Sequence, residues 1–377
     1  MEKTFSCSGK NFSHKKVLVI AELGTAHKGS LTKAKELIDR AVGAGADAVK
    51  FQIVYADEIL HPKTGIVSLP GGKIPLYENF KRLECTPDFF MRIAEYCEKK
   101  QVLFSASSFG ARSTDELAAL NPAFIKIASP ELNFVQLLEQ AAEKNIPLIL
   151  SGGVSTLSDI ELAVSRCRKF LKKDLALLHC ITSYPAPPDE YNLSLLEVLQ
   201  KIFDCAVGIS DHSYNEYLVP LLSIACGAAI VEKHFCLSND DDGLDDKIAL
   251  PPEKFSAMVR AIRQCEKYTV SEIQEKLFSL GFTETQIRQT LGNGKKALAQ
   301  SEEKNYGRSN RSLHYLRDIK AGERIGENDI AVLRTEKILS IGEHPKYLNY
   351  FIGSILQKDV QSGSGANFFD IIKRDNE

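Results

Sequence analysis

The sequence lacks the features of a membrane, secreted or polyanion-binding protein. Its 377 residues contain no run of about 18 apolar residues, and the segment before its first apolar run lacks the core of a secretion signal. No charge of one sign dominates, because 47 Lys and Arg stand against 49 Asp and Glu and leave a net charge of −2. We therefore expect a soluble cytoplasmic protein that binds neither nucleic acid nor membranes, and that holds any anionic ligand with local groups.

A paired arrangement of cysteines is missing as well. The nine cysteines are scattered and include no Cys-x-x-Cys pair. An odd number at irregular spacing argues against a disulfide framework and against a thiolate zinc site. We interpret these cysteines as reduced residues of the core.

Short apolar runs alternate with helix-period stretches over residues 1–267, the pattern of a parallel sheet covered by helices. The strand candidates are 17–22, 48–51, 102–106, 124–127, 147–151, 175–179, 206–210 and 230–234, and the helix candidates include 31–42, 87–100, 135–144, 157–170 and 214–226. Eight such units in about 250 residues match a (β/α)8 barrel. The alternative is an open doubly wound sheet, but the first turn, AELGTAHKGS, lacks the Gly-x-Gly-x-x-Gly spacing. Residues 3–16 are expected to cap the barrel floor.

The alternation of apolar runs and helix-period stretches ends at residue 267. Residues 268–305 begin with a polar helical stretch and continue as GNGKKALAQSEEKNYG, which we interpret as a linker. In residues 306–377, the step from Asp318 to Asp329 has the same length as the later step from Asp359 to Asp370. This internal repeat predicts a small, pseudo-symmetric, β-rich second domain.

Polar residues occupy the predicted C-terminal ends of the barrel strands, where such barrels carry their active sites. These residues are Glu22, Lys50, Ser107, Lys126 with Ser129, Ser151, Tyr184, Ser210 with His212, and His234. Packing alone does not explain so many polar strand ends at one mouth. The lysines and serines are expected to bind phosphate and carboxylate oxygens, although each lysine could instead pair with a local carboxylate or form a Schiff base.

Two histidines suggest a metal site in the same mouth. His212 and His234 follow neighbouring predicted strands, so both imidazoles can face one point. Two nitrogens without a thiolate leave room for water and substrate oxygen, which suits Mn2+ or Mg2+ better than structural zinc. Such a metal would polarise a substrate carbonyl, with Asp211 and Glu232 flanking the histidines.

Several ordered motifs carry a resemblance to a known family. They are IAELGTAHKGS, GADAVKFQ, FIKIASPELNF, LILSGGVST, LHCITSYPAP, VGISDHS, VEKHF, GLDDKIAL and NRSLHYLRDIKAGERI. In these motifs the sequence resembles the sialic acid synthases, which comprise bacterial N-acetylneuraminate synthases and their spore-coat polysaccharide relatives. The resemblance covers nearly the whole chain. It implies a barrel joined to a small antifreeze-like (SAF) domain, in a domain-swapped homodimer whose tails cover each other's active sites.

The resemblance also implies a reaction. Phosphoenolpyruvate condenses with the aldehyde form of an N-acetylated sugar, which gives a nine-carbon 2-keto acid and phosphate. By this resemblance His212 and His234 hold the metal, Glu131 handles water, and Glu22 orients the sugar or moves a proton. The residues expected to bind phosphoenolpyruvate are Lys50, Ser107, Lys126, Ser129, Ser151 and Ser210. Those expected at the sugar are Tyr184, Asp245 and the partner tail's Arg311, and Thr182 is a further expected substrate-binding residue.

The sequence departs from the family pattern in three places. Ala26 precedes His27 where the family usually has Asn, Thr182 replaces another Asn, and Asp246 stands where relatives often have His. These changes leave the acceptor sugar open among N-acetylmannosamine, its 6-phosphate, and diacetamido-dideoxy sugars that lead to legionaminic- or pseudaminic-type acids.

Other functions remain as alternatives. One is a lysine-dependent aldolase or lyase on the same barrel, and another is a paralogue that has lost turnover. A non-catalytic carbohydrate- or ice-binding role for the tail is disfavoured, because ice-binding surfaces need arrays of Thr-like residues and the tail after Tyr306 contains only Thr335.

Overall fold

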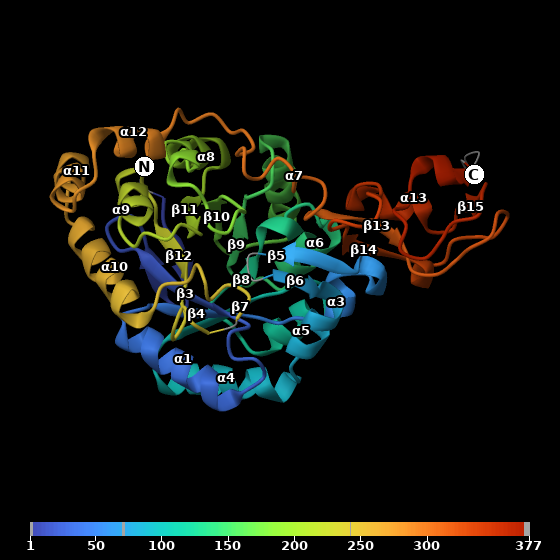
Figure 1. Cartoon of the computed structure of the whole chain (residues 1–377), viewed down its shortest axis with the longest axis horizontal. Helices are drawn as coiled ribbons and strands as arrows, with labels where there is room; N and C mark the ends of the chain where they lie inside the picture. Colours follow the sequence, from blue (N-terminus) through green and yellow to red (C-terminus); the bar gives the residue numbers. More distant parts are fainter. Residues whose placement is uncertain (1–2, 70–71, 242, 373–377) are drawn as a thin grey trace.

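Eight parallel strands form a closed barrel in the computed structural model, which describes residues 3–69, 72–241 and 243–372 (Figure 1). The barrel strands are β3 (Leu18–Gly24), β4 (Ala48–Gln52), β7 (Leu103–Ser107), β8 (Ile125–Ile127), β9 (Leu148–Ser151), β10 (Leu175–Cys180), β11 (Ala206–Asp211) and β12 (Ile230–His234). Pairing of β12 with β3 closes the ring. The predicted (β/α)8 barrel is confirmed, and the open doubly wound alternative is wrong.

Helices surround the barrel, and most of them present one apolar face to it. They are α1 (Leu31–Gly43), α4 (Pro87–Lys99), α5 (Ala111–Ala119), α6 (Val135–Glu143), α7 (Leu157–Arg168), α8 (Leu195–Phe203), α9 (Leu218–Ala225) and α10 (Pro252–Cys265). In α1, the buried residues Ala34, Leu37, Ile38 and Ala41 follow the helical repeat. The helix predicted at 214–226 begins only at Leu218, because Asn215 Oδ1 accepts the amide hydrogens of Tyr217 and Leu218 and forms a turn there.

Smaller elements connect and extend these units. An excursion that the sequence pattern did not predict follows β4, and it contains α2 (Ala56–Ile59), β5 (Ile66–Leu69), β6 (Gly72–Pro75) and α3 (Leu76–Leu83). Short 3-10 helices are η1 (Pro62–Thr64), η2 (Ser129–Glu131), η3 (Pro188–Glu190), η4 (Glu327–Asp329), η5 (Pro345–Tyr347) and η6 (Phe368–Asp370).

An N-terminal hairpin closes the barrel floor, as the sequence predicts. Strands β1 (Phe5–Cys7) and β2 (Lys10–Phe12) pair antiparallel. Phe5 and Phe12 are buried in one cluster with residues from around the barrel, among them Phe124 and Ile230. The hairpin therefore seals the end of the barrel opposite the strand C-termini.

The segment interpreted as a linker begins with α11 (Val270–Ser279) and α12 (Glu284–Leu291), which pack near α9. From residue 292 to 310 the chain has no helix or strand, and it runs past α8 and α7 to the second domain (Figure 1).

The C-terminal domain contains β13 (Arg311–Tyr315), β14 (Ile330–Arg334), α13 (Leu348–Phe351), β15 (Ile355–Leu356) and β16 (Ile371–Ile372). The internal repeat appears as reciprocal hydrogen bonds. Ala321 N donates to Asp359 Oδ1 at 2.9 Å, and Ser362 N donates to Asp318 Oδ1 at 2.8 Å. Each donor and each acceptor occupies the equivalent position in its own copy of the repeat, and the predicted pseudo-symmetric β-rich domain is confirmed.

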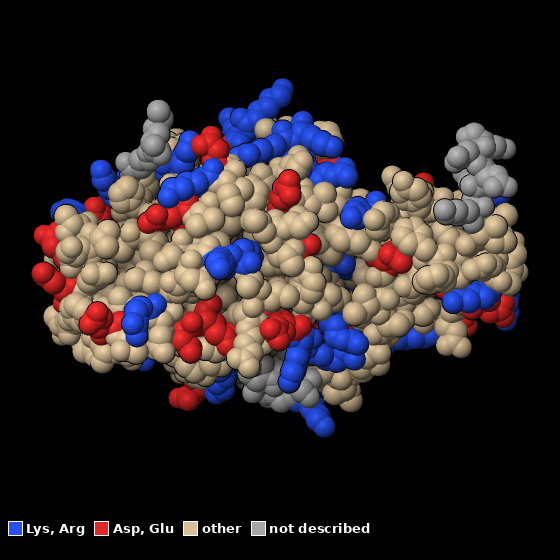
Figure 2. All heavy atoms as spheres, turned by 90° about the horizontal axis from the view of Figure 1, so that it is seen from above, with Lys and Arg blue, Asp and Glu red and all other residues tan. Residues whose placement is uncertain are grey.

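The charges on the surface and the state of the cysteines match what the composition predicts. Acidic and basic side chains are interspersed on the face shown in Figure 2. All nine cysteines are free, and all except Cys85 are buried. Among the described residues, no helix has both the length and the apolar character that crossing a membrane requires.

Candidate active site

A polar pocket opens at the C-terminal ends of the barrel strands, and it encloses about 440 Å3 of empty space including its mouth. Twelve of the fourteen predicted site residues line it, namely Glu22, Lys50, Ser107, Lys126, Ser129, Ser151, Thr182, Tyr184, Ser210, His212, His234 and Asp245. The other two, Glu131 and Arg311, are not part of this lining.

Lys126 is a buried cation with weak ionic compensation. It lies on β8, is only 2% exposed, and donates from Nζ to Ser151 Oγ at 2.7 Å. The carboxylate paired with it, Glu232, lies 3.6 Å away. Burial lowers the pKa of Lys126, and Glu232 offsets this only in part. An anionic ligand in the pocket would therefore gain a strong electrostatic partner.

Lys50 and Glu22 form a buried ion pair beside it. Lys50 Nζ lies 2.5 Å from Glu22 Oε2 and donates to Ser107 Oγ at 3.1 Å. Gln52 Nε2 donates to the other oxygen of Glu22 at 2.8 Å. Burial raises the pKa of Glu22 to about 7, although Lys50 opposes the shift. A carboxyl with such a pKa can take up or release a proton near neutral pH.

The two histidines lie together at the ends of β11 and β12. Their ring centroids are 5.3 Å apart, and Asp245 Oδ2 is 3.8 Å from His234 Nδ1. His212 Nδ1 donates to the Ile181 carbonyl at 2.8 Å, which leaves Nε2 to bind a cation once it is deprotonated. Burial lowers the pKa of His234 well below its usual value. Burial also lowers the pKa of His212, but Cys180 and the Ile181 carbonyl outweigh this effect and raise the pKa to about 9. A cation that binds His212 would therefore displace the proton of its imidazole.

The two histidines and the carboxylates beside them are the groups that could hold a divalent cation at an open site. Within the described residues, no group of three or more His, Cys, Asp or Glu side chains is arranged to hold a metal ion. However, two lysines face three carboxylates in the lining, Glu22, Glu232 and Asp245, and Glu232 Oε2 is buried without a hydrogen-bond partner. These carboxylates offset the charge of the lysines, so a bound divalent cation would strengthen the attraction for a multiply charged anion. Two imidazoles with adjacent carboxylates match Mn2+ or Mg2+, which keep water and substrate oxygens as ligands.

A second buried network supports His212 from behind. Lys233 and Asp211 are both buried, and Lys233 Nζ donates to Asp211 Oδ2 at 2.7 Å. Tyr191 OH donates to Asp211 Oδ1 at 2.6 Å and accepts the amide hydrogen of His212 at 2.8 Å. Ser213 N also donates to Asp211 Oδ1. The sequence suggested that Asp211 flanks the histidines, but it did not indicate Lys233 or Tyr191.

Glu131 and Arg311 meet each other in a separate buried cluster. Arg311 Nη2 lies 3.0 Å from Glu131 Oε1, and Arg334 Nη2 lies 2.7 Å from the same oxygen. Arg311 also donates from Nη2 to the Phe109 carbonyl at 2.9 Å and from Nη1 to that of Glu58. Arg311 thus joins the C-terminal domain to the barrel of its own chain. A role for Glu131 with water, and a contact from Arg311 to a sugar on a partner subunit, stay predictions.

Several lining residues escaped the sequence reasoning. Gln52, Cys180 and Glu232 line the pocket, and only Glu232 had been noted as a neighbour of the histidines. Gln52 follows Lys50 by two positions on β4, so the strand repeat placed both on one face and could have identified it.

The departures from the family pattern lie in different surroundings. Thr182 lines the pocket, whereas Ala26 and Asp246 do not. His27 is fully buried against Phe89, with ring centroids 4.8 Å apart. Asp246 accepts the amide hydrogen of Gly243 at 2.7 Å, which stabilises the turn before Asp245.

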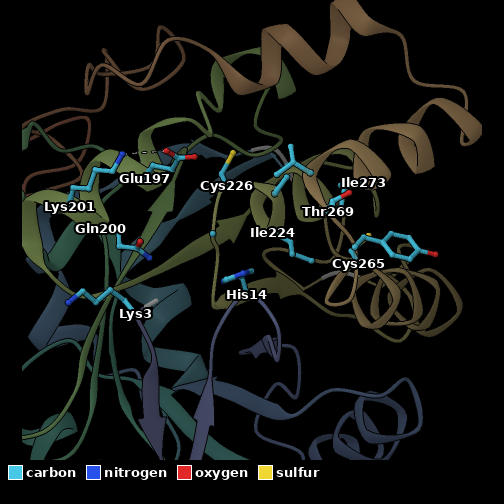
Figure 3. Close-up of a pocket in the computed structure, with 14 residues that line it drawn as sticks. Lys3, His14, Glu197, Gln200, Lys201, Ile224, Cys226, Cys265, Thr269 and Ile273 are labelled. Atoms are coloured by element: carbon cyan, nitrogen blue, oxygen red, sulfur yellow. Dashed lines mark ion pairs between the residues drawn. The ribbon is translucent and has the colours of Figure 1, made fainter. Parts of the chain in front are cut away.

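Another hollow lies away from the strand C-termini, between the N-terminal segment, α8 and α11 (Figure 3). Its walls include Ile224, Cys226 and Ile273, and Lys201 at its rim pairs with Glu197 at 3.6 Å. Its two lysines, Lys3 and Lys201, each pair with a carboxylate near the surface, and its lining contains a single imidazole, that of His14. The two buried lysines and two adjacent imidazoles of the polar pocket make that pocket the better candidate for the active site.

Comparisons with known proteins agree with this architecture. The NeuB family matches residues 37–274 and the SAF domain matches residues 310–366. The chain is 32% identical to the spore coat polysaccharide biosynthesis protein SpsE of Bacillus subtilis, over 96% of this chain and 95% of that protein. It is 31% identical to a pseudaminic acid synthase of Campylobacter jejuni, over 93% and 95% of the two chains. The crystal structure of Bacillus subtilis SpsE superposes with a TM-score of 0.81 over 99% of this chain and all of that one, at 30% identity.

Proposed function

Since this chain belongs to the NeuB family of synthases, we propose that it condenses phosphoenolpyruvate with the open-chain aldehyde of an N-acetylated aldose. Water is consumed, phosphate is released, and the product is a nine-carbon, sialic-acid-like 2-keto acid. The observation that carries the proposal is the pocket itself, in which two buried lysines with hydroxyl partners lie beside two imidazoles. Transferases of this type need such a pairing of anion-binding and carbonyl-activating groups.

The lysine side of the pocket suits phosphoenolpyruvate. Lys126 with Ser151, and Lys50 with Ser107, present ammonium and hydroxyl donors to phosphate and carboxylate oxygens. Ser129 and Ser210 are proposed to complete this set. Because these donors are fixed before the ligand arrives, they hold carbon 3 of phosphoenolpyruvate toward the sugar without reorganisation.

The histidine side suits the sugar aldehyde. His212 and His234 would hold a divalent cation, Mn2+ or Mg2+, which when bound supplies Lewis-acid polarisation of the aldehyde oxygen. Tyr184, whose ring stacks on His212 at 4.2 Å, and Asp245 are proposed to orient the sugar with Thr182. Glu22, with its pKa of about 7, is proposed to transfer a proton at the sugar oxygen.

Water must add at carbon 2 of the former phosphoenolpyruvate before phosphate leaves. We propose that Glu131, which follows η2 residues Ser129 and Pro130, orients this water. Its Oε2 accepts no hydrogen bond among the described residues, although it is fully buried. That oxygen is therefore available as an acceptor.

We further propose that the chain acts in the cytoplasm as a domain-swapped homodimer, with Arg311 of one subunit contacting the N-acyl group on the other. Large apolar side chains of the C-terminal domain support self-association, because Phe369 is 82% exposed and Tyr350 is 67% exposed. Light scattering after size exclusion measures the mass of the particle, and a monomer at micromolar concentration would overturn this part.

The reaction is tested by phosphate release from phosphoenolpyruvate with a panel of N-acetylated sugars, with and without Mn2+. The panel contains N-acetylmannosamine, its 6-phosphate and diacetamido-dideoxy sugars. Release should require one sugar, stop with chelator and disappear in His212→Ala. His14→Ala, in the hollow of Figure 3, is the matched control and should retain release. No release with any sugar would favour a paralogue without turnover.

A lysine-dependent aldolase is the second candidate, because burial lowers the pKa of Lys126 and favours a neutral amine. Borohydride trapping with pyruvate separates the two, since an aldolase would be labelled at Lys126 or Lys50 and a synthase would not.

A further inference from the structure

The connecting segment places two buried polar side chains against the loops at the pocket. Residues 292–310 have no helix or strand, yet Glu302 is fully buried and Asn310 is 6% exposed. The neighbouring carboxylate, Glu303, is exposed. A wholly buried carboxylate in an irregular segment needs specific hydrogen-bond partners.

Glu302 finds its partners on two separate barrel loops. Its Oε1 accepts the amide hydrogen of Val154, after β9, at 2.8 Å. The same oxygen accepts the amide hydrogen of Thr182, after β10, at 2.6 Å. Its Oε2 accepts a longer bond, 3.4 Å, from Ala299 N within the segment. One oxygen of Glu302 thus ties together two loops that lie far from it, and from each other, in the sequence.

Val154 has a backbone that needs such support. Its φ is 40°, in the left-handed region that β-branched residues rarely adopt. Its amide donates to Glu302, and its carbonyl accepts from Asn310 Nδ2 at 3.1 Å. Both backbone polar groups of this strained residue are therefore held by the connecting segment.

The held loops form one wall of the polar pocket. Gly153 N donates to Ser129 Oγ at 3.1 Å, and Ser129 and Thr182 both line the pocket. A methyl group on Gly153 would lie 2.2 Å from Thr182 Oγ1 and 2.9 Å from Ser129 Oγ. Because the packing is this close, a shift of either loop displaces both hydroxyls.

We propose that Glu302 and Asn310 are positioning residues, which fix the loops after β9 and β10 so that Ser129 stands in place for phosphoenolpyruvate and Thr182 for the sugar. The effect on catalysis rests on the proposed function, whereas the clamp on the loops does not. The connecting segment is in this sense a part of the site rather than a tether between domains.

The test compares Glu302→Ala, Glu302→Gln and the exposed control Glu303→Ala in the full-length chain. Amide hydrogen exchange follows Val154 and Thr182, and steady-state kinetics give KM for phosphoenolpyruvate and kcat separately. Removing the acceptor leaves the amides of Val154 and Thr182 unpaired, so Glu302→Ala should speed their exchange and raise KM by about tenfold to a hundredfold. Glutamine keeps the oxygen that accepts both bonds, so Glu302→Gln should stay within about threefold of wild type, and Glu303→Ala should match wild type.

Unchanged exchange and unchanged KM in a folded Glu302→Ala would overturn the proposal, and so would equal losses in the alanine and glutamine variants. If Glu302→Ala does not fold, Asn310→Ala removes only the bond to the Val154 carbonyl, and it should still speed exchange of the Val154 loop. If the wild-type protein releases no phosphate with any sugar, the proposed function fails, but the exchange comparison still decides whether the clamp exists.

Discussion

The buried pair of Lys233 and Asp211 makes a strong stability prediction. Both side chains are inaccessible to solvent, and their charged atoms are 2.7 Å apart. At an effective dielectric constant of about 20, unit charges at that distance attract by about 6 kcal/mol, which desolvation partly cancels. Removing one partner of such a pair typically destabilises a protein by about 3–5 kcal/mol, because the other charge stays buried.

For Lys233→Met we expect a loss of unfolding free energy at the lower end of that range, about 3 kcal/mol. Asp211 would keep its bonds from Tyr191 OH at 2.6 Å and from Ser213 N at 2.8 Å. For a domain of this size, about 2 °C per kcal/mol gives a fall in Tm of about 6 °C. Differential scanning calorimetry at pH 7 measures this fall, and Lys201→Met, on an exposed pair of α8, should change Tm by about 1 °C or less.

The double variant tests the reasoning more sharply than either single one. In Lys233→Met combined with Asp211→Asn, neither charge of the pair remains, so the combined loss should be at least about 2 kcal/mol smaller than the two single losses added together. Additive losses would show that the two charges do not compensate each other. A fall of less than about 1 °C in Lys233→Met would show that the buried carboxylate needs no cation.

Three other predictions concern the pocket and the second domain. Lys126→Met should raise KM for phosphoenolpyruvate about tenfold or more, since a charge-assisted hydrogen bond contributes about 1.5–3 kcal/mol. Lys173 is exposed, so Lys173→Met is the kinetic control. Equal KM values in the two variants would contradict the proposal that Lys126 binds phosphoenolpyruvate. Burial lowers the pKa of His314 to about 4. The neutral imidazole therefore stabilises the fold fully above about pH 6.5, and this stabilisation falls by about 3 kcal/mol as the pH decreases toward 4. Urea titrations at several pH values measure the fall, and His314→Gln should not show this part of it. Arg311→Lys should lower the unfolding free energy by about 3 kcal/mol, because lysine cannot reproduce the forked donors to Glu131, whereas Arg317→Lys on the surface should not.

The barrel and most of the pocket lining followed from the sequence because both depend on local patterns. Each strand carries its own apolar run, and the barrel rule places its last polar residue at one common mouth. Lys50, Lys126 and the histidines were therefore located without knowledge of any contact between them. The internal repeat of the second domain was visible for the same reason, since Asp318 and Asp359 recur in similar turns.

The rest depended on contacts between distant segments. Glu302 and Val154 are 148 residues apart in the sequence. Their hydrogen bond joins a side chain to a backbone amide, and no pattern of residue types predicts such a bond. Arg311 and Glu131 were both singled out, but nothing in the sequence showed that they bind each other. The start of α9 was misplaced because the turn made by Asn215 interrupts an otherwise helical pattern.

The hairpin on the barrel floor bears on how the protein is made. Phe5 is synthesised before every strand of the barrel, yet it packs in a cluster with Ile230, which belongs to the last barrel strand to be synthesised. At about 5–20 residues per second, the interval between them is about 11–45 s. Throughout it, the nascent chain carries Phe5 and Phe12 without the barrel that buries them. The hairpin is therefore translated before the barrel but buried only after the last barrel strand has been made, and during that interval it is exposed to chaperones.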